Sequence, residues 1–148
     1  MRRLQRRVAA LTGDMHARLN ALTHRDGSAL IRAYGPRDMA GRGGALAFNV
    51  LDPDGRALPY SRVEAAARDA GIAIRGGCFC NPGAAEAAFG IDGTRLADCL
   101  RQLGDTFTVP RLAACSGGAA GALRASPGLA SNAADIDRLV ALLQRFAG

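Results

Sequence analysis

Apolar residues recur every three or four positions at both ends of the chain, which is the spacing of amphipathic helices. The first stretch predicts a leading helix over residues 1–23 with arginines on its polar face. Asn132 can cap the last helix, and Asp135 lies favourably in its first turn. The apolar positions are Leu4, Val8, Leu11, Met15, Leu19 and Leu22 in the leading helix and Ile136, Leu139, Val140 and Leu143 in the last.

Short apolar runs between these helices predict β-strands, each ended by a stretch with Gly or Pro. The predicted strands are residues 29–34, 44–51, 72–75 and 122–126. Two further helices are expected, one starting at a capping box from Ser61 to Glu64 and one capped by Asp92. About four strands with packed helices make a two-layer α+β fold. We predict a single domain over residues 1–148, with its core in residues 29–148.

Composition and charge narrow the classes of function. A net charge of +6 and a pI near 10.1 raise the question of nucleic-acid binding. The arginines are spread along the chain, aromatic residues make up only 5%, and no recognition motif occurs, so we expect no nucleic-acid partner. No apolar run is long enough to span a bilayer, so we expect no membrane association.

Four cysteines and two histidines are candidates for chemistry. In the absence of an export signal, we expect the cysteines to be reduced thiols in a cytoplasmic protein. Cys99 lies on an apolar helical stripe, where packing explains it, and we assign no role to Cys115. His16 and His24 are expected on the surface. No Cys-x-x-Cys pair exists and no histidine is suitably placed, so we expect no metal site.

The strongest chemical signal is the segment Arg-Gly-Gly-Cys-Phe-Cys-Asn-Pro-Gly-Ala over residues 75–84. Asn81 and Pro82 are typical of a helix start, which places Cys80 just before the cap, where the helix N-terminus favours a thiolate. The alternative is that Cys78 and Cys80 are small buried apolar residues. A loop between a strand and a helix is a common ligand position in α/β architecture. We therefore take Cys80 as the candidate nucleophile.

This segment resembles a loop in the C-terminal domain of class V aminotransferase-fold enzymes, which depend on pyridoxal phosphate (PLP). The molybdenum cofactor sulfurases are nearest in pattern, and cysteine desulfurases have a related loop. The cysteine that accepts sulfur in those families matches Cys80 rather than Cys78. Two residues depart from the pattern: Gly76 stands where the family usually has Thr, and Ala85 where the sulfurases usually have a further Cys.

A second segment, Arg-Ala-Ser-Pro-Gly-Leu-Ala-Ser-Asn over residues 124–132 followed by Asp135, is similar to the closing motif of class V aminotransferases. In that family the arginine binds the α-carboxylate of the substrate, which implies the same role for Arg124. A guanidinium pairs with a carboxylate through two parallel hydrogen bonds, so the residue type suits the role. The alternative is a surface arginine on an edge strand.

The resemblance implies a mechanism. Arg124 anchors the carboxylate of a cysteine substrate bound to PLP. Cys80, as a thiolate, attacks the sulfur of that substrate and becomes a persulfide, and alanine is released. Arg75 supports the loop and its anionic sulfur. The same resemblance leaves open an aminotransferase, lyase or isomerase that lacks sulfur transfer, and a non-catalytic interaction domain derived from such an enzyme.

All 19 basic residues are arginine, and the chain contains no lysine. A PLP enzyme holds its cofactor as a Schiff base on lysine, so this chain cannot form that linkage, and no cofactor-binding residue is assigned to it. We expect PLP to be held mainly by a companion large domain, which the leading helix would join. The other expected partners are a homodimer mate and the amino-acid substrate.

Overall fold

The computed structural model describes residues 2–77, 87–90, 92–116, 119 and 121–148. Its centre is a four-stranded sheet, and the neighbouring strands pair antiparallel. The order across the sheet is β1-β2-β4-β3. The strands are β1 (Ile31–Tyr34), β2 (Leu46–Val50), β3 (Arg75–Gly77) and β4 (Ala122–Ala125). The predicted α+β fold with about four strands is confirmed.

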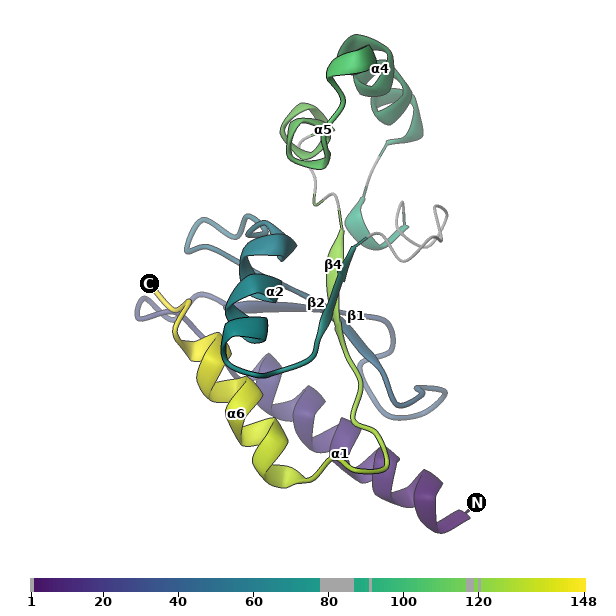
Figure 1. Cartoon of the computed structure of the whole chain (residues 1–148), viewed down its shortest axis with the longest axis vertical. Coiled ribbons are helices and arrows are strands. Elements are labelled where there is room, and N and C mark those ends of the chain that lie inside the picture. The colour runs from purple at the N-terminus through teal and green to yellow at the C-terminus, as the bar shows by residue number, and fades with distance from the viewer. Residues whose placement is uncertain (1, 78–86, 91, 117–118, 120) are drawn as a thin grey trace.

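Apart from a short helical stretch at residues 87–89, the helices in the described residues fall into two groups. One group forms a layer on one side of the sheet and consists of α1 (Arg2–Asn20), α2 (Tyr60–Asp69) and α6 (Ala133–Gln144) (Figure 1). The other group lies beyond the end of the sheet and consists of α4 (Gly93–Leu103), the 3-10 helix η1 (Gly104–Thr106) and α5 (Val109–Ser116). Because α4 and α5 pack against one another, we call this second group the α4–α5 hairpin.

The apolar core lies between the sheet and the helical layer. Phe48 of β2 and Leu123 of β4 are paired in register, and both are fully buried. Met15 and Leu19 of α1 and Leu143 of α6 pack into the same core. The helical spacing of apolar residues at the two ends of the chain therefore identified the three buried helix residues correctly.

The third strand lies further along the chain than predicted. We expected residues 72–75 to form the strand and the two following glycines to break it, but β3 runs from Arg75 to Gly77. Gly76 fits because the ring of Tyr60 lies directly over it, and Gly77 has a positive φ of 145°, which favours glycine. A Cβ at position 76 would come within 2.4 Å of the Tyr60 Cδ2 atom. Close approach of another group, rather than a turn, explains the glycine at 76.

The predicted capping box at the start of α2 is wrong. The helix begins at Tyr60 after Pro59, and no side chain caps it. Glu64, the expected partner within the box, instead accepts a hydrogen bond from the backbone N–H of Gly76 at 3.0 Å. The carboxylate therefore binds the edge strand of the sheet rather than the start of its own helix.

His24 is buried, contrary to the expectation of a surface residue, and only 3% of it is exposed. Its Nδ1 accepts from the backbone N–H of Gly148 at 2.9 Å, so Nε2 carries the proton and donates to the Leu51 carbonyl at 3.2 Å. His16 is partly exposed. Desolvation lowers the pKa of His16, and the charge of Arg42 lowers it further.

Replacing Gly76 with alanine tests the packing of Tyr60 on β3. We expect Gly76→Ala to lower the free energy of unfolding by about 1–3 kcal/mol, because the new methyl group overlaps the ring. Denaturant unfolding of the purified chain measures the change.

Gly93→Ala is the matched control, since a Cβ there meets no atom within 4 Å and the change should stay within about 0.5 kcal/mol. In a Tyr60→Ala background, Gly76→Ala should cost at least about 0.5 kcal/mol less than in the parent. Equal costs in the two backgrounds would contradict the proposed contact.

Candidate functional site

The two predicted site arginines lie directly opposite one another. In the register between β3 and β4, Arg75 pairs with Arg124. The two Cβ atoms of such a cross-strand pair lie about 5 Å apart. The buried residues Leu123 and Ala125 flank Arg124 on its strand, so the side chain of Arg124 points to the sheet face opposite the helical layer. Both arginines are exposed to solvent on that face.

The row of paired residues continues across the whole sheet. Arg124 pairs with Ala47 of β2, and Ala47 pairs with Tyr34 of β1. The small side chain of Ala47 therefore lies between Arg124 and the Tyr34 ring. One face of the sheet thus carries two guanidinium groups, a methyl group and a phenol side by side, which suits a small anion with an apolar part.

A polar network supports this row. The hydroxyl of Tyr34 donates to Asn49 Oδ1 at 2.7 Å, and Asn49 Nδ2 donates to the Gly121 carbonyl at 3.0 Å. Asn49 is only 1% exposed, so both bonds satisfy a buried amide. Burial raises the pKa of Tyr34, although the nearby Arg32 opposes the shift. The ring of Phe89 packs edge-on against Tyr34, with centroids 5.2 Å apart.

Sequence reasoning missed Tyr34 and Asn49. The one available signal was Asn49 itself, a polar amide within the most apolar predicted strand of the chain. A buried amide needs hydrogen-bond partners, so an asparagine at position 49 indicates a polar neighbour from another strand.

The candidate nucleophile Cys80 and its neighbour Cys78 lie outside the described residues. The chain enters that segment directly from Gly77, the last residue of β3, two positions after Arg75. The role of Cys80 therefore stays a prediction, as do the substrate-binding roles of Arg75 and Arg124.

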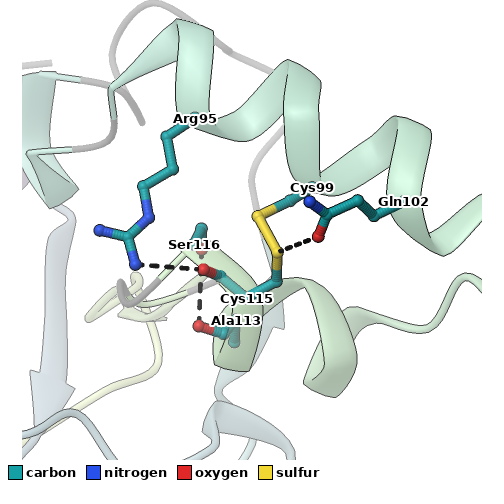
Figure 2. Close-up of a disulfide and its surroundings, with 6 residues drawn as sticks. All are labelled: Arg95, Cys99, Gln102, Ala113, Cys115 and Ser116. Atoms are coloured by element: carbon teal, nitrogen blue, oxygen red, sulfur yellow. Dashed lines mark hydrogen bonds between the residues drawn. A yellow bond between two sulfur atoms is a disulfide. The ribbon is translucent and has the colours of Figure 1, made fainter.

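The expectation of four reduced thiols is wrong for two of them. Cys99 of α4 and Cys115 of α5 form a disulfide (Figure 2). Figure 2 also shows Arg95 of α4 donating to the Cys115 carbonyl at 3.3 Å, so a hydrogen bond joins the same two helices. Cys99 is buried as predicted, but it is buried through this bond rather than by an apolar core. The cytoplasmic location rested on reduced thiols and stays a prediction.

The part of the chain that the structure describes shows neither a metal cluster nor a membrane span. No group of three or more His, Cys, Asp or Glu side chains within it could hold a metal ion. No helix in the described ranges is long and apolar enough to cross a membrane. The full sequence contains no lysine, so its residues do not fit a covalent PLP site.

Comparison with known proteins gives two kinds of match. The sequence is 31% identical over 151 residues to molybdenum cofactor sulfurase of Drosophila melanogaster and 33% identical over 156 residues to that of Anopheles gambiae. These alignments cover 97% and 98% of this chain, respectively, but 19% of each relative. The chain thus spans about a fifth of the length of these relatives. No family model matches the sequence.

The fold is similar to part of a solved enzyme, the apo cysteine desulfurase from Thermococcus onnurineus NA1. The TM-score is 0.58 with 19% sequence identity, and the match covers 98% of this chain and 26% of that one. At this identity the likeness shows the fold alone.

The disulfide predicts how the cysteines respond to reduction. In the unreduced chain we expect alkylation to leave Cys99 and Cys115 unlabelled, and in the reduced chain to label both. Closing a loop of this size contributes about 3 kcal/mol in the chain-entropy estimate. Reduction should therefore speed amide exchange in α4 and α5 and leave that of β2 and β4 unchanged.

Peptide mapping by mass spectrometry and hydrogen exchange measure these two effects. Cys78→Ser/Cys80→Ser is the control, because in this variant the mapped thiols belong only to the hairpin. Labelling of Cys99 in the unreduced, folded chain would contradict the bond.

Proposed function

We propose a function for this chain from two findings: its sequence is similar to molybdenum cofactor sulfurases, and its fold is similar to part of a cysteine desulfurase. In this proposal the chain is the part of a PLP-dependent enzyme that binds the carboxylate of an amino-acid substrate and accepts its sulfur. The cofactor lies on a companion domain. A homodimer mate completes the proposed assembly.

The observation that carries the proposal is the pairing of Arg75 with Arg124. Like charges directly opposite in a sheet repel, and an anion bound between them offsets that repulsion. A carboxylate fits the planar guanidinium fork through two hydrogen bonds. In the proposed site Arg124 anchors the α-carboxylate. Arg75 adds a second positive charge next to it, at the start of the segment that carries the cysteines.

Cys80 is the proposed sulfur acceptor. Its thiolate forms a new S–S bond with the sulfur of the substrate while the C–S bond of the substrate breaks. The electron pair of that bond leaves with the carbon, which takes up a proton and is released as alanine. The step needs an electron sink at the substrate, which PLP bound to the proposed companion domain would supply.

A second candidate follows from the composition of the chain. Because no lysine can hold PLP, the chain also suits a non-catalytic interaction domain derived from such an enzyme. Within the fold, an aminotransferase, lyase or isomerase would use the arginine pair without sulfur transfer. Substitution of the arginine and of the cysteine separates these possibilities.

Removal of the Arg124 guanidinium tests the proposed carboxylate site in the complete enzyme. If the companion domain and substrate desolvate Arg124 in the complete enzyme, Arg124→Ala should lower kcat/KM for cysteine by a factor equivalent to about 2–5 kcal/mol of transition-state stabilisation. Arg124→Lys keeps the charge but loses the planar fork, so its loss should be smaller. Steady-state kinetics measure both variants.

Arg56→Ala is the matched control, because the Arg56 side chain is 79% exposed and pairs only with Asp54 in the described ranges. A value for Arg124→Ala within about twofold of the parent, under roughly 0.5 kcal/mol, would contradict the site. If the chain is a non-catalytic domain, neither Arg124→Ala nor Arg56→Ala should change kcat/KM.

Cys80 is expected to be alkylated faster than Cys78 near neutral pH. The physical reason is its place before the Asn81-Pro82 helix signal, since a helix N-terminus lowers the pKa of a thiol. Timed labelling of the unreduced chain with peptide mapping measures both rates, with Cys80→Ser reporting the rate of Cys78 alone. Faster labelling of Cys78 would remove the basis for choosing Cys80.

A further inference from the structure

We propose that Glu64 and Tyr60 of α2 are positioning residues that hold β3 in register and so keep Arg75 opposite Arg124. The contacts stand on their own, whereas their functional meaning rests on the function proposed above. Neither residue touches the proposed substrate; both act through the backbone of β3.

The strand β3 needs support from outside the sheet. It is three residues long, lies at the edge of the sheet, and has glycine at two of its three positions. Glycine in a strand has no side chain to pack and loses more conformational freedom on folding than other residues. An edge strand also presents N–H groups that no neighbouring strand accepts.

Glu64 accepts a hydrogen bond from one of those N–H groups. Its Oε1 atom lies 3.0 Å from the backbone nitrogen of Gly76, and the contact is partly buried. A hydrogen bond to a charged acceptor is stronger than one to a neutral acceptor. Val63 and Ala67 fix the helix beneath the carboxylate, since both are fully buried. The Glu64 carboxylate therefore belongs to a packed helix rather than to a loop.

The ring of Tyr60 packs against the face of the same strand. A Cβ on Gly76 would lie 2.4 Å from Tyr60 Cδ2, and a Cβ on Gly121 would lie 2.9 Å from Tyr60 Cε1. One ring therefore covers backbone on β3 and on the residue that leads into β4. The same Cβ on Gly121 would lie 2.8 Å from the carbonyl of Gly77, so the two backbones also approach closely there.

These contacts act one residue from the site. Gly76 follows Arg75 directly, and a strand with period-two alternation turns every side chain to the other face when its register slips by one residue. Loss of the support at Gly76 would therefore turn Arg75 away from Arg124. The sheet would stay folded, but the face that carries Arg124 would lose the guanidinium of Arg75.

Amide exchange of Gly76 in the full chain tests the contact with Glu64. We expect Glu64→Ala to speed exchange of the Gly76 amide by about tenfold or more, because the side-chain acceptor is lost. Glu64→Gln keeps a carbonyl acceptor and should restore most of the protection. The Leu123 amide should not change, and Ser61→Ala, an exposed position on the same helix, is the matched control.

A sulfate titration followed by NMR of the arginine Nε–H groups tests the positioning role. In the parent chain Arg75 and Arg124 should respond to sulfate together. In Glu64→Ala the response of Arg75 should weaken by about tenfold while Arg124 still responds, and Glu64→Gln should restore it. An unfolding midpoint alone would not distinguish these variants.

Three outcomes would overturn the inference. Unchanged exchange at Gly76 in Glu64→Ala removes the contact itself. Faster exchange with an unchanged Arg75 response leaves Glu64 as a stabilising residue only. If neither arginine of the parent responds to sulfate, the proposed anion site fails and the positioning role fails with it, while the Gly76 exchange separately reports whether Glu64 supports β3.

Discussion

The pairing of β3 with β4 is the constraint on which the candidate site depends. Arg75 and Arg124 are 49 positions apart in sequence, and only this pairing brings them together. The pairing in turn depends on glycine, because the backbones of Gly77 and Gly121 approach so closely that a Cβ on Gly121 would overlap the Gly77 carbonyl. The close approach at Gly77 and Gly121 is thus part of what places Arg75 opposite Arg124.

Much of the fold follows from the sequence because it is encoded locally. The amphipathic spacing of α1 and α6 reflects the 3.6-residue helical period, and Asn132 with Asp135 forms the capping box that closes the N-terminus of α6. Asp92 caps α4 as predicted, by accepting a hydrogen bond from Thr94. Each of these features needs only residues within one helical turn of each other.

The errors arise where distant contacts override local signals. Gly76 and Gly77 predict a strand break, yet both lie in β3, and the glycine at 76 is there because the Tyr60 ring occupies the space of a side chain. Glu64 predicts a helix cap, yet it binds the edge of the sheet. The disulfide of the α4–α5 hairpin joins residues on two helices, and cysteine spacing alone does not determine such a pairing. Arg75 and Arg124 belong to two separate motifs, and the sequence contains no sign that they are neighbours.

The proposed function requires that Arg75 and Arg124 act on one bound substrate, and a double-mutant cycle in the proposed complete enzyme tests this requirement most directly. The measurement is kcat/KM for cysteine in Arg75→Ala, Arg124→Ala and the double variant. Two arginines that share a substrate should be coupled, so the double variant should lose less than the sum of the single losses by about 1 kcal/mol or more. Losses that add to within about 0.5 kcal/mol would show that the two side chains act independently and would contradict the shared site.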